Sequence, residues 1–252
     1  QRLVDWAATY LPHYFDEPFA PLHERIIDAV GEAGMPTFVG AFRGAGKSVL
    51  LALARPLREV LDGRARYIIY GSQVQRLAAQ NMDYVRVELE RNPRVRCDYG
   101  EMETSGGKTD WTVMPLRTGR PARLEAFGTG MSPRGRRFGE LRPDEFVGDD
   151  LEDAELARNP EREQYLWDWL LDEVLPALEP RRFRFTVLGT MFGPQCMLQR
   201  ARALAERKDP TGRALARLVL EPVLRDGRSA WPERFPDGEL ARLRAQVGLR
   251  NW

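Results

Sequence analysis

A segment with two glycines, a lysine and a serine is the part of this chain best suited to bind phosphate. It follows the apolar residues Phe38 and Val39 and precedes a helix-forming run at 49–54. Backbone N–H groups of such a loop, and of the helix that follows it, attract phosphate oxygens. We therefore predict a phosphate-binding P-loop that consists of Ala41, Phe42, Arg43, Gly44, Ala45, Gly46, Lys47 and Ser48.

The end of this loop has the chemistry needed to bind a magnesium-nucleotide. Lys47 would reach the β- and γ-phosphates of ATP, and the Ser48 hydroxyl would bind Mg²⁺. The usual pattern G-x-x-x-x-G-K-[ST] begins with glycine, whereas this chain has Ala41. Alanine fits if its φ is negative, so we interpret the segment as a variant P-loop. Arg43 would meet the γ-phosphate or couple it to a lid, or it faces solvent.

A short apolar run that ends in two carboxylates is the second chemical element. Phe146-Val-Gly leads directly into Asp149 and Asp150. In a Walker B strand, the terminal Asp holds Mg²⁺ and a neighbouring acid orients the attacking water. Asp149 fits the magnesium role. Asp150 has the expected position for the second role and Glu152 has the longer reach, so both stay candidates for the catalytic acid.

Strand and helix patterns alternate along the chain, which predicts βαβ units and a mostly parallel sheet flanked by helices. The predicted strands are 37–39, 66–70, 124–128, 145–148, 183–188 and 215–223, and the predicted helices are 48–61, 73–91, 160–175 and 238–246. The polar, glycine-rich stretch 100–110 is typical of a mobile surface loop. We expect residues 1–208 to form the core and 209–252 a peripheral subdomain or linker. Gly189 and Thr190 follow the strand at 183–188, where the Thr190 hydroxyl would sense the γ-phosphate, or the two residues simply form a turn.

Composition limits which partners and metal sites the chain can have. The formal net charge is only +1, so any binding of nucleic acid needs a local basic patch. Only three of the 38 basic residues are lysine, which makes Lys47 stand out. Cys97 and Cys196 are isolated, which argues against a zinc site and favours a reducing compartment. The sequence contains no apolar run long enough for a membrane span, so no membrane partner is expected.

Arginines form two groups with possible functions. One lies just before the acidic strand, and one of its members would serve as an arginine finger; alternatively its members contact DNA or solvent. It consists of Arg134, Arg136, Arg137 and Arg142. The other is a basic loop that would contact DNA phosphates, or is simply solvated; it consists of Arg117, Arg120 and Arg123.

Taken in order, these elements resemble the large terminase subunit of tailed bacteriophages, an ATPase that packages double-stranded DNA. The similarity covers nearly the whole chain. It includes the P-loop, Tyr67-Ile-Ile-Tyr-Gly-Ser-Gln73, Glu90-Arg-Asn-Pro93, Gly128-x-Gly-Met-Ser-Pro-Arg-Gly135, Arg142-Pro-Asp144, Asp149-Asp-Leu-Glu-Asp153, Trp169, Glu173–Pro180, the Leu-Gly-Thr strand and Trp231-Pro-Glu233. It begins at Phe19-Ala-Pro-Leu-His23.

The resemblance implies an ASCE-type, RecA-like P-loop ATPase core with a small lid. It implies ATP and Mg²⁺ as cofactors, with double-stranded DNA, a portal protein and a small terminase subunit as partners in the cytoplasm of an infected bacterium. A ring of about five copies would place a neighbour's arginine at each site, with Arg137 or Arg142 among the candidates. Thr190 would couple phosphate state to motion. Phe19, Pro21 and His23 would frame the adenine, although a structural role for His23 is equally open.

Family members usually add a nuclease domain, and we interpret the 252 residues as the motor domain without nuclease activity. Two other functions remain open from the sequence. A helicase-like nucleic-acid ATPase would share the P-loop and the acidic strand, but it needs a second RecA-like domain. A non-catalytic nucleotide-binding module for ring assembly would not need Lys47 and the acids intact.

Overall fold

The computed structural model describes residues 1–31, 33–193 and 196–247. Within them, eight strands form one twisted sheet in the order β3-β4-β5-β2-β6-β7-β1-β8. The strands are β1 Pro36–Ala41, β2 Tyr67–Ser72, β3 Thr104–Gly106, β4 Asp110–Val113, β5 Ala122–Gly128, β6 Glu145–Gly148, β7 Arg184–Gly189 and β8 Arg217–Glu221. No helix in the described part of the chain is both long and apolar enough to span a membrane.

The six strands from β5 to β8 in this order run parallel, and β3 and β4 are antiparallel additions at one edge. β7 lies between β1 and β6, with Gly40 opposite Gly189 and Gly148 opposite Val187. One strand between the phosphate-loop strand and the acidic strand is the ASCE arrangement, so the predicted α/β fold class is confirmed. Parallel strands end at the same edge of a sheet, which brings the P-loop, Thr190 and Asp149 to one side.

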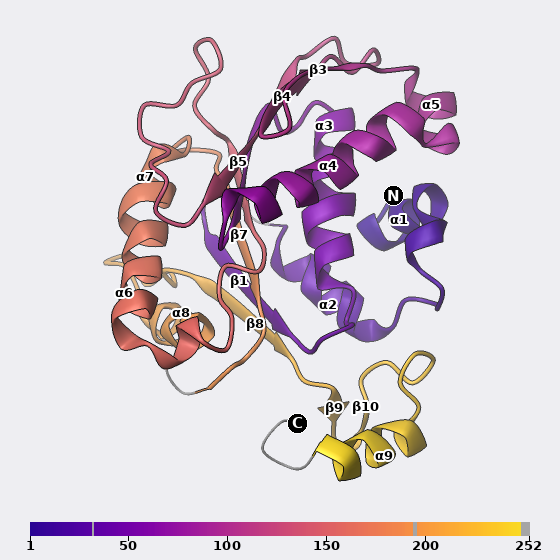
Figure 1. Ribbon diagram of the computed structural model, residues 1–252, viewed down its shortest axis with the longest axis vertical. Coiled ribbons are helices and arrows are strands. Elements are labelled where there is room, and N and C mark those ends of the chain that lie inside the picture. The colour runs from indigo at the N-terminus through magenta and orange to yellow at the C-terminus, as the bar shows by residue number, and fades with distance from the viewer. Residues whose placement is uncertain (32, 194–195, 248–252) are drawn as a thin grey trace.

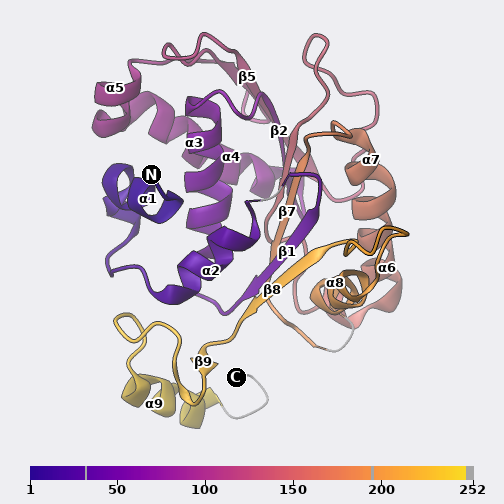
Figure 2. The same ribbon diagram turned by 180° about the vertical axis from the view of Figure 1, so that it is seen from behind.

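Helices cover both faces of the sheet, because its central strands are apolar on both sides. Figures 1 and 2 show α1 to α5 on one face and α6 to α8 on the other. The first group is α1 Leu3–Tyr10, α2 Pro21–Ala29, α3 Arg55–Leu61, α4 Gln75–Arg91 and α5 Pro93–Tyr99, and the second is α6 Pro160–Asp168, α7 Leu175–Ala177 and α8 Met197–Glu206. π-helical stretches at Val49–Ala54 and Trp169–Val174 precede α3 and α7, and single 3-10 turns lie at Pro12–Tyr14 and Leu156–Arg158.

Helix α4 illustrates how the sequence produces this packing. Its buried residues include Ala78, Met82, Val85 and Leu89, which recur every three or four positions and form one apolar stripe against the sheet. The helix ends at Arg91, and the side chain of Asn92 accepts hydrogen bonds from the N–H groups of the next helix. This cap is a common way to start a helix after a turn.

The prediction of a mobile loop at 100–110 is wrong in part, because β3 within this stretch pairs with β4 as a hairpin. On β4, Trp111 and Val113 are buried while the residues between and beside them are half-exposed. β3 itself is short, polar and largely exposed, so it carries no apolar alternation from which a strand is recognised.

The C-terminal part leaves the sheet only after Glu221. β8 follows the predicted boundary at 208/209, yet it pairs with β1 in the main sheet. Beyond it, β9 Leu224–Arg225 and β10 Arg228–Ser229 form a small hairpin, followed by α9 Asp237–Val247. These elements project from the end of the sheet where β8 terminates (Figure 1). The division into two domains stays a prediction.

Candidate nucleotide-binding site

The P-loop has the backbone that its glycines predict. Gly44 and Gly46 adopt φ values of 81° and 74°, in the left-handed region that favours glycine. Ala41 is the last residue of β1 and is not among the described residues with positive φ. Alanine at the first position is therefore compatible with the turn. Helical backbone begins at Lys47, so the last two residues of the P-loop, Lys47 and Ser48, already belong to the helix.

The P-loop and the acidic strand converge, as the interpretation required. Asp149 follows β6, and its carboxylate lies close enough to the Ser48 side chain and the Lys47 charge for both to lower its pKa. Burial raises the pKa of Asp149 to about 6, the negative charge of Asp150 adds to this, and Ser48 and Lys47 oppose it. Only 3% of Asp149 is exposed. The P-loop and the carboxylate that follows β6 thus lie together at the carboxyl edge of the sheet.

The donor set at this edge fits Mg²⁺. Asp149 Oδ1 is buried and has no hydrogen-bond partner, so this carboxylate has an unused acceptor beside the Ser48 hydroxyl. Carboxylate and hydroxyl oxygens are the hard ligands that Mg²⁺ prefers, and its remaining positions normally go to phosphate oxygens and water. The described residues contain no cluster of three or more His, Cys, Asp or Glu side chains for a metal. A metal would therefore depend on the nucleotide for further ligands.

The two candidate catalytic acids have different surroundings. Asp150 is exposed and adopts a left-handed φ of 49°, with its carbonyl accepting from Gln73 N–H at 3.2 Å. Glu152 is 8% exposed, and both its carboxylate oxygens accept from the N–H of Met197, at 3.0 and 3.2 Å. Burial raises the pKa of Glu152 to about 7, against the Met197 hydrogen bond. Asp150 is thus open to solvent, whereas the carboxylate of Glu152 is hydrogen-bonded to the first residue of α8.

Gly189 ends β7 beside Gly40 of β1, and Thr190 follows it, half-buried. The predicted coupling residues therefore stand directly beside the strand that leads into the P-loop. Their position agrees with the expectation, and their role stays a prediction.

His23 lies beneath the P-loop. It is fully buried between the rings of Phe19 and Trp231, at centroid distances of 5.2 and 4.5 Å. The Ala20 N–H donates to His23 Nδ1 at 2.8 Å, and a Cβ placed on Gly46 would lie 3.5 Å from Nε2. Burial lowers the pKa of His23, which favours the neutral ring. The structural alternative for His23 is favoured over contact with adenine, whereas Phe19 is half-buried and Pro21 exposed.

Two C-terminal aromatic residues complete the surroundings of the loop, although sequence reasoning assigned them no role at the site. Trp231 Nε1 donates to the Pro18 carbonyl at 2.9 Å. Phe235 packs edge-to-face on Phe42, and a Cβ on Gly44 would lie 3.0 Å from its ring. The available signal was Trp231-Pro-Glu233, which belonged to the resemblance only as a motif. Arg43, by contrast, is exposed.

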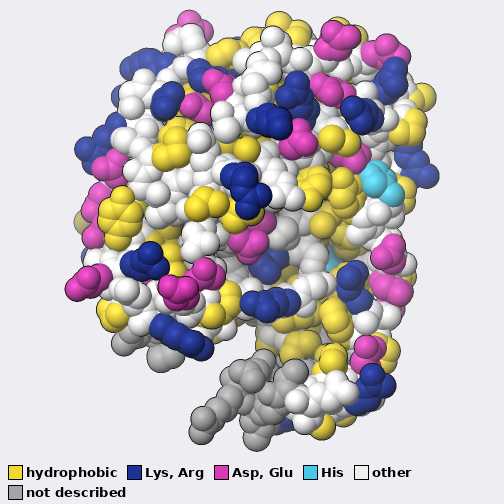
Figure 3. All heavy atoms as spheres, in the orientation of Figure 1, with side chains coloured by type: hydrophobic (Ala, Val, Ile, Leu, Met, Phe, Trp, Pro, Cys, Tyr) yellow, Lys and Arg dark blue, Asp and Glu magenta, His cyan; other side chains and the backbone are white. Residues whose placement is uncertain are grey.

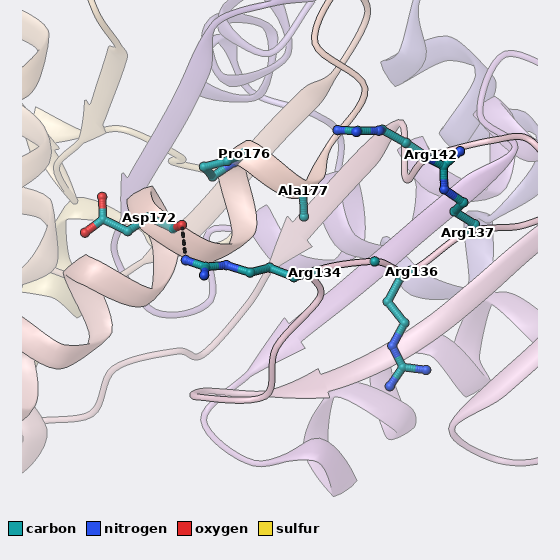
Figure 4. A pocket seen from close by; sticks show the side chains of 8 residues that line it. Arg134, Arg136, Arg137, Arg142, Asp172, Pro176 and Ala177 are labelled. Carbon is teal, nitrogen blue, oxygen red and sulfur yellow. Dashed lines mark hydrogen bonds between the residues drawn. The ribbon is translucent and has the colours of Figure 1, made fainter.

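The arginines before the acidic strand surround a pocket of about 310 Å³ with Asp172, Pro176 and Ala177. Figure 4 shows Arg134 reaching to the Asp172 carbonyl, 3.1 Å away, while Arg136 points elsewhere. Arg142 comes just before β6 begins, whereas Asp149 comes after β6 ends. The pocket, lined by Arg134, Arg136, Arg137 and Arg142, therefore lies at the opposite edge of the sheet from the P-loop of the same chain.

Three of the five predicted DNA-binding arginines are engaged by carboxylates of their own chain. Arg123 forms a two-pronged pair with Asp110 at 2.9 and 2.7 Å, and Arg136 pairs with Glu125 at 3.1 Å. Arg134 lies 3.4 Å from Glu173. Arg117 rests over the Tyr99 ring and Arg120 is exposed. Figure 3 shows basic and acidic side chains interspersed on one face, without a continuous basic surface.

Comparison with solved structures identifies the fold. The ATPase domain of the large terminase from Thermus phage P74-26 superposes with a TM-score of 0.61 over 94% of this chain and 91% of that one, at 12% identity. The fold of this chain is that of a phage large-terminase ATPase domain. A mutant of the same Thermus phage domain gives a TM-score of 0.58 at 11% identity, over 94% of this chain and 92% of that chain. No protein-family description and no curated protein matches the sequence.

A lower similarity, with a TM-score of 0.38, relates the chain to the large terminase of another thermophilic bacteriophage in complex with ATP-γ-S. That comparison has 11% identity and covers 79% of this chain and 52% of that one. The two Thermus phage matches are the ones that establish the fold, and they extend over 94% of the present chain although the sequence identity is only 11–12%.

Proposed function

We propose that this chain is the ATP-hydrolysing motor domain of a viral DNA-packaging terminase. The observation that carries the proposal is the meeting of Ser48 and Lys47 with the buried carboxylate of Asp149 at the carboxyl edge of the sheet. The strand order that places β7 between the two motifs, and the terminase ATPase fold, support the same function.

Each residue at this edge has a role in hydrolysis. The N–H groups of the P-loop and the ammonium group of Lys47 would hold the phosphates, and Ser48 and Asp149 would hold Mg²⁺. Mg²⁺ held by Ser48 and Asp149 would supply positive charge that offsets the negative charge of the phosphates during hydrolysis. Asp150 would orient the attacking water, because it is the exposed acid beside Asp149. Thr190 would respond to the γ-phosphate.

An arginine from a neighbouring copy would complete the site. The pocket arginines lie at the edge opposite the P-loop, so they serve another chain's phosphates better than their own. Arg137 and Arg142 are the better candidates, because Arg134 and Arg136 have carboxylate partners within their own chain. Where such a finger has been measured in other systems, it contributes about 10³–10⁵ in rate.

Double-stranded DNA is the proposed substrate of translocation, contacted through Arg117 and Arg120 on the exposed loop. Phosphate contacts of this kind are independent of sequence and weaken with salt, as a moving motor needs. A portal protein, a small terminase subunit and further copies in a ring of about five are the proposed partners. They would act in the cytoplasm of an infected bacterium.

Phosphate release from Mg-ATP is the direct test. Wild-type protein should hydrolyse ATP, and faster at concentrations where copies associate. Lys47→Ala should abolish hydrolysis, while Lys108→Ala, a matched change of an exposed lysine, should leave it unchanged. Nucleotide binding without hydrolysis, even with DNA and portal present, would overturn the proposal and favour a module for ring assembly.

A further inference from the structure

The first turn of α8 is the point where three parts of the nucleotide site meet. Leu198 lies over the end of β1 that leads into the P-loop, since a Cβ on Gly40 would be 2.7 Å from Leu198 Cδ1. Met197 lies over the end of β7 that precedes Thr190, since a Cβ on Gly189 would be 3.3 Å from Met197 Cε. Glu152 joins the same turn to the acidic segment through the Met197 N–H.

The hydrogen bond from the Met197 N–H to Glu152 gives a partner to a backbone N–H at the start of α8. The first N–H groups of a helix lack partners within it, and a side chain normally caps them. The residue before α8 is Cys196, whose side chain provides no such cap. The cap comes instead from Glu152, 45 positions earlier in the chain. The negative carboxylate also suits the positive end of the helix.

The other side of α8 is tied to the rest of the domain. Arg200 forms an ion pair with the buried carboxylate of Glu163 on α6 and donates to Gln164 Oε1 at 2.6 Å. Helix α8 is therefore held at two places, by Glu152 near the site and by α6 away from it. If the segment that contains Asp149 and Glu152 moved, the Glu152 hydrogen bond would displace the first turn of α8. The Arg200 ion pair would hold the next turn in place.

We propose that Glu152 is a positioning residue that transmits the state of the nucleotide site to α8, and that it does not activate the water. This inference rests on the proposed ATPase function. It separates the two acids that the sequence left open: Asp150 acts on the water, and Glu152 carries the response of the Asp149–Asp150 segment to the helix.

The test uses hydrogen exchange of the α8 amides after Met197, measured with and without Mg-ATP-γ-S, alongside nucleotide affinity and kcat. Wild-type protein should show a change in exchange at these amides when the nucleotide binds. Glu152→Ala should lose that change and keep its nucleotide affinity. Glu152→Gln retains an oxygen that accepts the Met197 N–H, so the nucleotide-dependent change in exchange should persist. Its kcat should fall by less than about tenfold, whereas loss of a general base would lower kcat by about 10²–10⁴-fold.

A second pair of variants tests the donor. Met197→Pro removes the N–H, and proline is well tolerated at the first position of a helix. Cys196 is already extended, at φ −72° and ψ 160°, as the residue before a proline must be. Met197→Ala is its matched control, because it shortens the same buried side chain and keeps the N–H. Met197→Pro should lose the nucleotide-dependent change, and Met197→Ala should keep it.

Two results would overturn the inference. One is a nucleotide-dependent change that survives both Glu152→Ala and Met197→Pro. The other is a loss of kcat in Glu152→Gln as large as that expected for a general base, with the exchange response intact. A wild-type protein that binds no nucleotide fails in the titration itself, before any exchange is measured, and overturns the proposed function together with this inference.

Discussion

Replacing Asp149 by asparagine should make the metal-free protein more stable while it abolishes hydrolysis. The wild-type carboxyl has a pKa of about 6 in the folded protein, against 3.8 in an unperturbed aspartate, because it is buried. Below pH 3.8 it is protonated in both folded and unfolded chains. As pH rises from about 3.8 to about 6, the unfolded chain ionises while the buried carboxyl stays protonated, so stability falls and then levels off once the folded protein is ionised too. The full effect is about 3 kcal/mol.

Asparagine does not ionise, so the variant lacks this cost at every pH. The stability of Asp149→Asn relative to wild type should therefore grow by about 2 kcal/mol between about pH 4.5 and about pH 8. Urea denaturation at both pH values, in buffer with a metal chelator, measures this difference. Because Glu145 and Glu152 titrate equally in both proteins, their contributions cancel. A difference that does not change with pH would refute the reasoning.

Three further outcomes are expected. Asp150→Asn should lower kcat by about 10²–10⁴-fold with little change in nucleotide affinity, measured by phosphate release and titration. Gly71→Ala would place a Cβ 2.6 Å from the buried ring of Phe146, so it should reduce the free energy of unfolding by about 1–3 kcal/mol, and Phe146→Leu should restore part of this. Arg117→Ala should weaken DNA binding and reduce the slope of affinity against salt by about one, whereas an unchanged slope would remove Arg117 from the interface.

The position of the site followed from local sequence. The P-loop, Asp149 and Thr190 each come directly after a buried apolar strand, and parallel strands end at one edge, so their convergence was predictable. The same logic does not extend to the second acid. A carboxylate three residues after Asp149 looks the same in sequence whether it faces water or caps a helix, and the N–H that Glu152 accepts lies 45 positions later.

Ion pairing between distant segments is the other part that the sequence did not reveal. From the sequence, Arg123 and Arg136 resemble free cations of two arginine-rich segments, yet each has a carboxylate partner on β4 or β5. His23 likewise is enclosed in part by Trp231, which lies more than 200 positions further along the chain. Each of these assignments depends on tertiary contacts that no local pattern encodes.

The arginine pocket and the P-loop occupy opposite edges of the sheet, and this restricts how copies can associate. An arginine of one chain that serves the phosphates of the next joins two unlike surfaces. Such heterologous contacts repeat head to tail, so they cannot produce a two-fold symmetric dimer. In an open row of copies, the chain at one end has a P-loop that no neighbour's arginine reaches, and the chain at the other end has an arginine pocket that serves no neighbour. These two ends meet only if the rotation between successive copies closes the row into a ring. Only a closed circle would then give every chain a complete site.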